Sequence, residues 1–155
     1  MADETLTAET TTTATATAPA PAAKPDKGGF FWGTGRRKAA VARVRIRPGK
    51  GKFLINGREI DHYFTELRDQ NDATAPLRET KTVDGLDVFV NVHGGGYMGQ
   101  AGAVLLGVAR ALKIYDPSLE PILRDNNFLS RDPRRVERKK YGQPGARKRF
   151  QFSKR

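Results

Sequence analysis

The sequence predicts a small α+β domain over residues 30–130, with strands and helices mixed along the chain. One observation behind this is a segment in which apolar and basic residues alternate strictly, as in a half-buried strand. Another is a glycine-rich turn that joins a second alternating segment to an amphipathic helix. The composition also changes at both ends, where residues 1–29 and 131–155 are too poor in apolar residues to build a core. We therefore expect one modest domain between two non-globular ends.

The N-terminal segment, residues 1–29, is predicted to be a disordered leader. Sixteen of its first 23 residues are Ala or Thr, and low-complexity polar tracts of this kind do not fold alone. Asp3, Glu4 and Glu9 occur with no early Arg, which argues against a secretory signal or a transit peptide. No segment of the sequence approaches the roughly 18 apolar residues of a membrane helix. The chain has no cysteine, which excludes disulfides and thiol catalysis and fits a cytoplasmic protein.

The first alternating segment runs from Ala40 to Arg47 and predicts a strand with one apolar face. Its other face carries arginines spaced about 6.6 Å apart at the rise of a β-strand. A glycine-proline turn leads to a second strand, Lys52 to Ile55, which ends at the strong turn signal Asn56-Gly57. We expect these two strands to form a hairpin whose exposed face and tip are cationic.

The run from Arg36 to Lys52 contains basic residues throughout and no acid. A strand face lined with arginine is often only a solvent-exposed surface, but the length of this run favours a surface that faces phosphates. The candidate contacts are Arg36, Arg37, Lys38, Arg43, Arg45, Arg47 and Lys50.

Between residues 59 and 87 acids outnumber bases, and Tyr63, Phe64 and Leu67 have the spacing of a short helix. We expect this stretch to be structural and to face away from any nucleic acid. A third strand, Leu86 to Val92, follows it. Further along, Asp116-Pro117 is predicted to open a helix that runs through Leu123, with Asp as N-cap and Pro at the first helical position.

Between the third strand and this last helix lies Gly94 to Gly99, followed by a helix with an apolar face made of Ala101, Val104, Leu105, Val108 and Leu112. The segment satisfies the dinucleotide-binding pattern G-x-G-x-x-G literally. We reject that interpretation because no further β-α units follow, as a doubly wound fold requires. The backbone N–H groups of Gly94, Gly95 and Gly96 at a helix N-terminus still suit phosphate. Glycines within the helix, Gly99, Gly102 and Gly107, cost about 1 kcal/mol each against Ala, so we expect close backbone approach to the sheet or to RNA.

No catalytic or metal-binding set stands out, because His62 and His93 are isolated from each other and from paired carboxylates in the sequence. We therefore expect neither enzymatic activity, nor a cofactor, nor a metal site.

The C-terminal segment, residues 131–155, holds eleven basic residues against two acids, which is +9 of the formal net charge of +11. Its aromatics, Tyr141, Phe150 and Phe152, lie among these basic residues. Such a tail should be extended and mobile alone, and a nucleic acid would neutralise and order it. The alternative is a solvated basic tail that only aids solubility.

Several motifs occur in an order that makes the chain similar to a known family. These are Gly35-Arg36-Arg37-Lys38-Ala39-Ala40-Val41-Ala42-Arg43-Val44, Pro48-Gly49-Lys50-Gly51, Ile55-Asn56-Gly57-Arg58, Gly94-Gly95-Gly96, Gly99-Gln100-Ala101-Gly102-Ala103 and Gln151-Phe152-Ser153-Lys154-Arg155. Together they closely resemble the bacterial-type family of ribosomal protein number nine of the small subunit. The resemblance extends from about Phe31 to Arg155.

This resemblance implies a mainly antiparallel sheet packed with helices, a left-handed β-α-β unit and a long extended basic C-terminal tail. It also implies a place in the head of the small subunit, among neighbouring head proteins and on ribosomal RNA. The tail of the family reaches toward the anticodon stem-loop of peptidyl-site tRNA, which assigns tRNA contacts to Ser153, Lys154 and Arg155. Further ribosomal RNA contacts are assigned to Gln100, Arg131, Arg134, Arg135, Arg138, Lys139, Lys140, Tyr141, Arg147, Lys148 and Arg149.

Two departures from the family pattern stand out. Family members often carry basic residues where Gln143-Pro144-Gly145 stand, so we expect the middle of the tail to hold RNA less tightly. The Ala/Thr-rich leader lies outside the shared pattern altogether. The alternative function is a free nucleic-acid-binding protein, a chaperone or regulator, and a nucleotide-dependent enzyme is the least favoured class.

Overall fold

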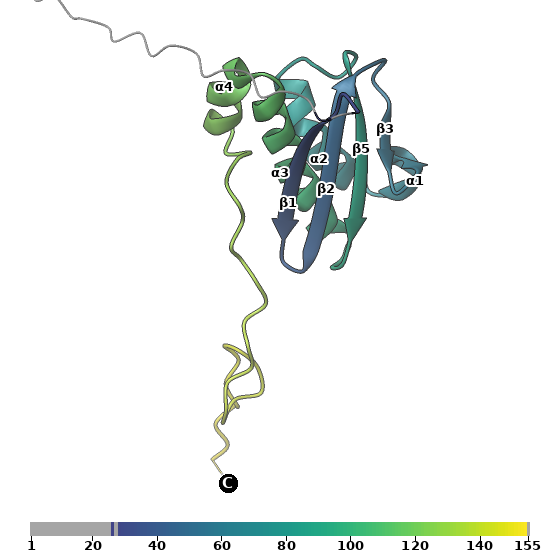
Figure 1. Cartoon of the computed structure of the whole chain (residues 1–155). Coiled ribbons are helices and arrows are strands. Elements are labelled where there is room, and N and C mark those ends of the chain that lie inside the picture. Colours follow the sequence, from purple (N-terminus) through teal and green to yellow (C-terminus); the bar gives the residue numbers. More distant parts are fainter. Residues whose placement is uncertain (1–25, 27, 155) are drawn as a thin grey trace, which may run out of the picture.

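A five-stranded sheet packed against helices forms the domain (Figure 1). The computed structural model describes Asp26 and residues 28–154, so nearly all of the predicted leader lies outside the described residues. In chain order the elements are β1 (Phe31–Arg37), β2 (Ala40–Pro48), β3 (Phe53–Ile55), β4 (Arg58–Glu59), α1 (Ile60–Tyr63), α2 (Leu67–Glu79), β5 (Leu86–His93), α3 (Tyr97–Tyr115), the 3-10 helix η1 (Pro117–Leu119) and α4 (Glu120–Asp125). The predicted α+β class is confirmed.

The strands lie in the order β1-β2-β5-β3-β4, and every neighbouring pair is antiparallel except β3 and β5. Helices α2 and α3 pack together, and α3 lies along β1 and β2. In Figure 1 these helices lie behind the sheet, and the other face of the β1-β2-β5 sheet is turned toward the viewer. One face of the sheet is therefore covered, and the opposite face is open.

The predicted hairpin between residues 40–47 and 52–55 is wrong. Strand β2 pairs with β1 on one side and with β5 on the other, so β5 lies between β2 and β3. The reason is that β5 carries a row of apolar side chains, and a central position in the sheet buries that row. The carboxylate of Asp87 also accepts hydrogen bonds from the backbone N–H groups of Lys50 (2.9 Å) and Lys52 (3.2 Å), which fixes the connection away from a hairpin turn.

The hairpin partner of β2 is β1. The inward-facing positions of β1 are the glycines Gly33 and Gly35, because the backbone of α3 lies directly against them. A Cβ added to Gly35 would lie 1.8 Å from the carbonyl oxygen of Ala103, and one added to Gly33 would lie 2.2 Å from that of Gly107. A Cβ on Gly107 would in turn lie 2.6 Å from Cγ2 of Val44. The close approach expected for the helix glycines is thus confirmed at Gly107, and it is an approach to the sheet.

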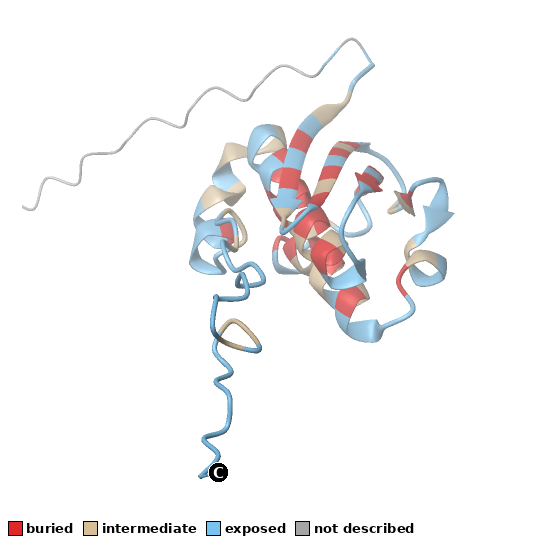
Figure 2. Ribbon diagram, turned by 90° about the horizontal axis from the view of Figure 1, so that it is seen from below, coloured by how far each residue is buried: buried red, intermediate tan, exposed pale blue. Residues whose placement is uncertain are grey.

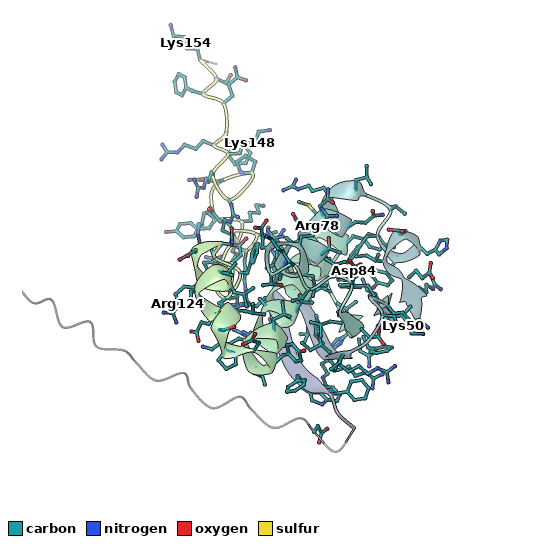
Figure 3. All side chains as sticks on the ribbon, turned by 90° about the horizontal axis from the view of Figure 1, so that it is seen from above. Lys50, Arg78, Asp84, Arg124, Lys148 and Lys154 are labelled. Carbon is teal, nitrogen blue, oxygen red and sulfur yellow. The ribbon has the colours of Figure 1, made fainter. Side chains whose placement is uncertain are left out.

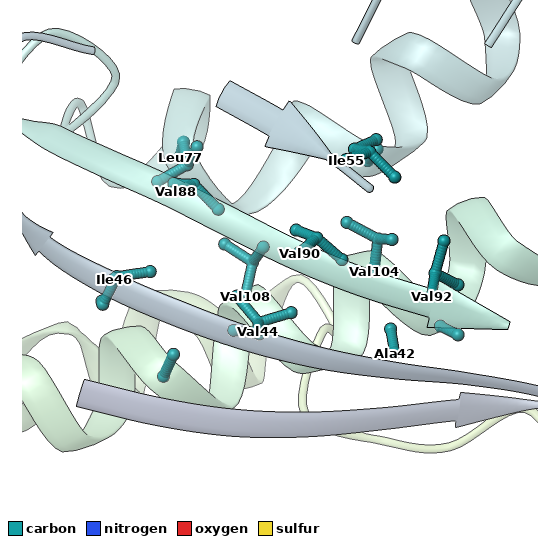
Figure 4. Packing of buried hydrophobic residues seen from close by; sticks show 14 of the residues in the cluster. Ala42, Val44, Ile46, Ile55, Leu77, Val88, Val90, Val92, Val104 and Val108 are labelled. Atoms are coloured by element: carbon teal, nitrogen blue, oxygen red, sulfur yellow. The ribbon is translucent and has the colours of Figure 1, made fainter. Parts of the chain in front are cut away.

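The core lies between the sheet and α3. Val44 and Ile46 of β2, Val88 of β5, and Val104 and Val108 of α3 are completely buried and interlock across the two layers (Figure 4). Each such side chain contributes about 1.5–3 kcal/mol relative to an exposed one. Burial alternates along β2, as Figure 2 shows by colour, which confirms the period-two prediction for this strand.

The turns and caps follow the chemistry of their residues. Asn56 and Gly57 both have positive φ, 49° and 81°, and join β3 to β4 as a tight hairpin turn. Asp116 Oδ1 accepts from the backbone N–H of Ser118 (2.9 Å), so the predicted N-cap is confirmed, although the helix begins as 3-10. The single short helix expected around Tyr63 and Leu67 is instead two helices, α1 and α2, because the chain at Phe64 is extended and Phe64 is buried in the core.

Residues 131–154 contain neither helix nor strand. They leave the domain beyond α4 and run past the end of the sheet where β1 turns into β2 (Figure 1). Most of these residues are exposed, as the pale blue of the tail in Figure 2 shows. No helix among the described residues is long and apolar enough to span a membrane.

Candidate nucleic-acid interface

The open sheet face consists of the outward-facing side chains of β1, β2 and β5. Strand register places them in rows across the three strands. The first row is Trp32, Arg45 and Phe89, the second Thr34, Arg43 and Asn91, and the third Arg36, Val41 and His93. The three predicted contacts Arg43, Arg45 and Arg47 therefore lie on one face with Arg36.

Two phenylalanines contact the guanidinium groups of Arg45 and Arg47. The guanidinium carbon of Arg45 lies 5.4 Å from the ring centre of Phe30 and 5.5 Å from that of Phe89. For Arg47 the corresponding distances are 5.6 and 5.2 Å, and the two rings meet edge to face at 6.1 Å. Such contacts contribute about 0.5–1 kcal/mol each at exposed sites. They hold the two cations in place without neutralising them.

Asp87 is the acid beside this cationic row. It is buried, and its Oδ2 accepts from Arg47 Nε and Nη2, both at 3.4 Å. Backbone hydrogen bonds from Lys50 and Lys52, and then Arg47, hold the pKa of Asp87 below its usual value. Arg47 is therefore partly neutralised, whereas no carboxylate of the described chain pairs with Arg43 or Arg45.

Arg37 joins the domain to the start of the tail. Its Nη1 donates to the carbonyl oxygen of Met98 (3.0 Å), and its Nη2 donates to Asp132 Oδ2 (3.1 Å). Arg134 grips the same carboxylate, with Nε 3.0 Å from Oδ1 and Nη2 3.0 Å from Oδ2. The hydrogen bonds of Arg134, and then of Arg37, hold the pKa of Asp132 far below its usual range. Arg37, which was predicted to contact RNA, thus forms an ion pair within the protein.

A hollow of about 350 Å³ lies beside this tail anchor. Its lining includes Lys38 from the β1-β2 turn, Arg68 from α2 and Arg135 from the tail. It brings cations of three distant segments together, and Arg68 had no sequence signal that would place it there. Lys50, which was predicted at the cationic tip of the hairpin between residues 40–47 and 52–55, lies at the opposite end of β2 from Lys38.

The glycine turn precedes α3. Gly94 and Gly95 have positive φ, and Gly96 is the N-cap of the helix. Gln100 fixes the turn, because its Nε2 donates to the carbonyl oxygen of Gly94 (3.1 Å) while its Oε1 accepts from the hydroxyl of Tyr63 (2.8 Å). A hollow of about 360 Å³ opens beside Gly95 and Gly96. Its lining also includes Arg58 and His62, which the sequence pattern did not assign to this place.

The described tail carries its remaining cations outward. Arg147 forms an ion pair with Glu137 that closes a loop within the tail, and Arg138 donates to the carbonyl oxygen of Lys139 (3.3 Å). Figure 3 shows Lys148 and Lys154 well away from the domain. Arg155 lies outside the described residues. Within the described residues no ion pair engages the other predicted tail contacts, which are Arg131, Arg135, Lys139, Lys140, Tyr141, Lys148, Arg149 and Ser153.

The geometry as a whole is that of a nucleic-acid-binding protein. An open arginine-lined sheet face, a glycine turn at a helix N-terminus and an exposed basic tail lie on one small domain. Within residues 28–154, no group of three or more His, Cys, Asp or Glu side chains is placed to hold a metal ion.

Comparison with known proteins then gives the family. The family model described as ribosomal protein S9/S16 matches residues 35–155, and the chain belongs to this family. The small ribosomal subunit protein uS9 of Anaeromyxobacter sp. (strain K) is 54% identical over 122 residues, which cover 79% of this chain and 94% of that protein. The protein of the same name from Thermotoga neapolitana is 52% identical over 128 residues, covering 81% and 96%. This is a family of ribosomal proteins, so the prediction that the chain is not an enzyme is confirmed.

Proposed function

We propose that the protein is a structural constituent of the small ribosomal subunit and binds its ribosomal RNA in the head. The observation that carries this proposal is the family match over residues 35–155, which includes the arginines of the open sheet face, the glycine turn and the basic tail together. The relatives are named as small-subunit proteins, and the match to this chain covers nearly their whole length. In this function the protein works in the cytoplasm, within the ribosome, beside neighbouring head proteins.

Phosphate neutralisation is the main source of affinity. Arg43 and Arg45 on the open sheet face, with Arg131 and Arg135 near the tail anchor, replace counterions along the RNA backbone. The glycine turn adds backbone N–H donors at a helix N-terminus. Contacts of this type position a protein without reading sequence, so specificity comes from the shape of the folded RNA.

The tail has a second role in this proposal, because it extends away from the domain (Figure 1). We assign its last residues, Ser153, Lys154 and Arg155, to the anticodon stem-loop of peptidyl-site tRNA. Arginine can hold a phosphate with two parallel donors, which lysine cannot. Removal of these three residues should leave subunit assembly nearly intact and speed dissociation of peptidyl-site tRNA. Unchanged tRNA affinity and dissociation in purified truncated subunits would refute this role.

Two finer features of the fold belong to the same proposal. The crossover from β3 through α1 and α2 to the parallel strand β5 is assigned the left-handed sense of the family. Residues 131–155 are assigned to a tail unit separate from the 30–130 domain. Support for this tail unit comes from the lack of helix and strand in residues 131–154.

Gradient sedimentation of a cell lysate at low and raised salt tests the main proposal. Co-migration with small subunits, in stoichiometric amount and resistant to raised salt, is the expected result. Migration as free protein, or release by modest salt, would instead support a free nucleic-acid binder, because binding through phosphates without a fitted site is strongly salt-dependent.

A further inference from the structure

The open sheet face carries aromatic side chains as well as arginines. Trp32 is 46% exposed although it lies in β1, directly beside Arg45 of β2. On the other side of Arg45 lies Phe89 of β5, so the first row of the face reads aromatic, cation, aromatic. Phosphate binding alone does not require rings on this surface.

We propose that this row binds the bases of an unpaired stretch of RNA, which stack on the exposed indole of Trp32 and, beside it, on the guanidinium group of Arg45, which Phe89 supports. The inference rests on the proposed RNA-binding function and specifies single-stranded RNA as the ligand of the open sheet face. Bases stack on aromatic side chains and on arginine guanidinium planes alike. The sequence pattern did not reveal this site, because Trp32 and Phe89 are 57 positions apart and meet only through β2.

The dimensions of the row suit adjacent nucleotides. Neighbouring strands lie about 4.8 Å apart, so the backbone positions of Trp32 and Arg45, which are paired across β1 and β2, are roughly 5 Å apart. The side chain of Trp32 is held by its edge, since Nε1 donates to Asp26 Oδ2 at 3.3 Å. A hydrogen bond in the plane of the indole leaves the ring faces for stacking. Phe30 and Phe89 contact the guanidinium group of Arg45 and hold it beside Trp32.

The second and third rows provide polar groups beside the stacking row. Arg43 and Asn91 lie next along β2 and β5, followed by His93. Their donors and acceptors match the exposed edges of unpaired bases and the adjoining phosphates. Of the acids beside this face, Asp87 is already engaged with Arg47 and two backbone N–H groups, and Asp26 accepts from Trp32. The charge of the face therefore favours a polyanion over an apolar or basic protein partner.

Fluorescence of the purified full chain tests the inference directly, because Trp32 is the only tryptophan in the sequence. The probes are an unstructured RNA oligonucleotide on the order of ten nucleotides long, an RNA duplex of equal length, and inorganic polyphosphate. We expect saturable quenching of Trp32 by the single strand. Polyphosphate should bind without quenching, since it has charge but no bases.

Substitutions separate stacking from charge. Trp32→Ala should weaken binding of the single strand by about 5- to 150-fold, the effect typical for loss of one base stack. Trp32→Phe keeps a ring and should retain most of the affinity. Leu67→Ala, which removes an exposed apolar side chain from α2, in the acidic stretch assigned away from RNA, should change little. Affinities of these variants are measured by fluorescence anisotropy of labelled RNA.

Single-stranded RNA that binds without quenching Trp32, or equal affinity of Trp32→Ala and the parent chain, would overturn the inference. Equal quenching by the duplex would overturn it as well. These results are distinct from failure of the proposed function. A chain that sediments with small subunits but shows no quenching refutes only base stacking. A chain that shows quenching but sediments free keeps the stacking site and refutes the ribosomal role.

Discussion

Replacement of Arg43 by alanine should reduce the salt dependence of RNA binding by one phosphate contact. Arg43 lies at the centre of the open sheet face, between Thr34 and Asn91, and no carboxylate in the described part of the chain pairs with it. Its charge is therefore fully available to an RNA phosphate. The matched variant, Arg47→Ala, removes a cation that Asp87 already partly neutralises.

The size of the effect follows from counterion release. Each neutralised phosphate contributes about 0.7 to 0.9 to the slope of log K against log salt. Between about 50 and 200 mM salt, a fourfold change, one contact changes affinity by roughly threefold. The ratio of the RNA affinity of the parent chain to that of Arg43→Ala should therefore decrease about threefold as the salt concentration rises across this range. For Arg47→Ala the change should be smaller.

Filter binding of the full chain to purified small-subunit ribosomal RNA, at several salt concentrations, measures the slope. Arg78→Ala serves as the control, because this residue lies in α2, in the acidic stretch assigned away from RNA. An unchanged slope for Arg43→Ala would refute the reasoning, as would an equal loss of slope for Arg78→Ala.

Three further predictions concern the fold and the tail anchor. Gly35→Ala should lower the melting temperature of the domain strongly, because the added Cβ would meet the backbone of α3. Gly85→Ala is the control, since a Cβ there meets nothing within 4 Å, and equal melting temperatures of the two variants would contradict the prediction. Asp87 has a lowered pKa in the folded state, so its stabilisation is present above the ordinary value of 3.8 and is lost as pH falls through and below it. Urea midpoints between about pH 5 and 3 should fall less steeply for Asp87→Asn than for the parent, and parallel curves would count against the role of Asp87. Asp132→Asn should speed hydrogen exchange around Arg134 with little change in melting temperature, and unchanged exchange would show that the ion pairs do not hold the tail.

Sequence alternation was sufficient where burial is periodic. The strands β2 and β5 were predictable because their inward residues are apolar at every second position. The same alternation placed Arg43 and Arg45 on one face. Strand β1 gave no such signal, since Gly33 and Gly35 occupy its inward positions, and their reason lies in α3, about 70 residues further along the chain.

Long-range pairing explains the remaining errors. The β2-β3 hairpin was inferred from a local turn, but β5 offers β2 a longer apolar partner and separates it from β3. The anchoring of Arg37 by Asp132 joins residues 95 positions apart, so no local pattern could reveal it. The aromatic row of the open sheet face has the same origin, because Trp32 and Phe89 meet only after the sheet forms.

Ultraviolet crosslinking within intact small subunits, followed by peptide mapping, identifies the segments of the chain that contact RNA. We expect the open sheet face and the tail to contact RNA and the acidic α2 region to be free of it. We predict RNA crosslinks in peptides from residues 30–50 and 131–154, and none from residues 60–85. Crosslinks confined to residues 60–85, or absent from both basic regions, would contradict the account.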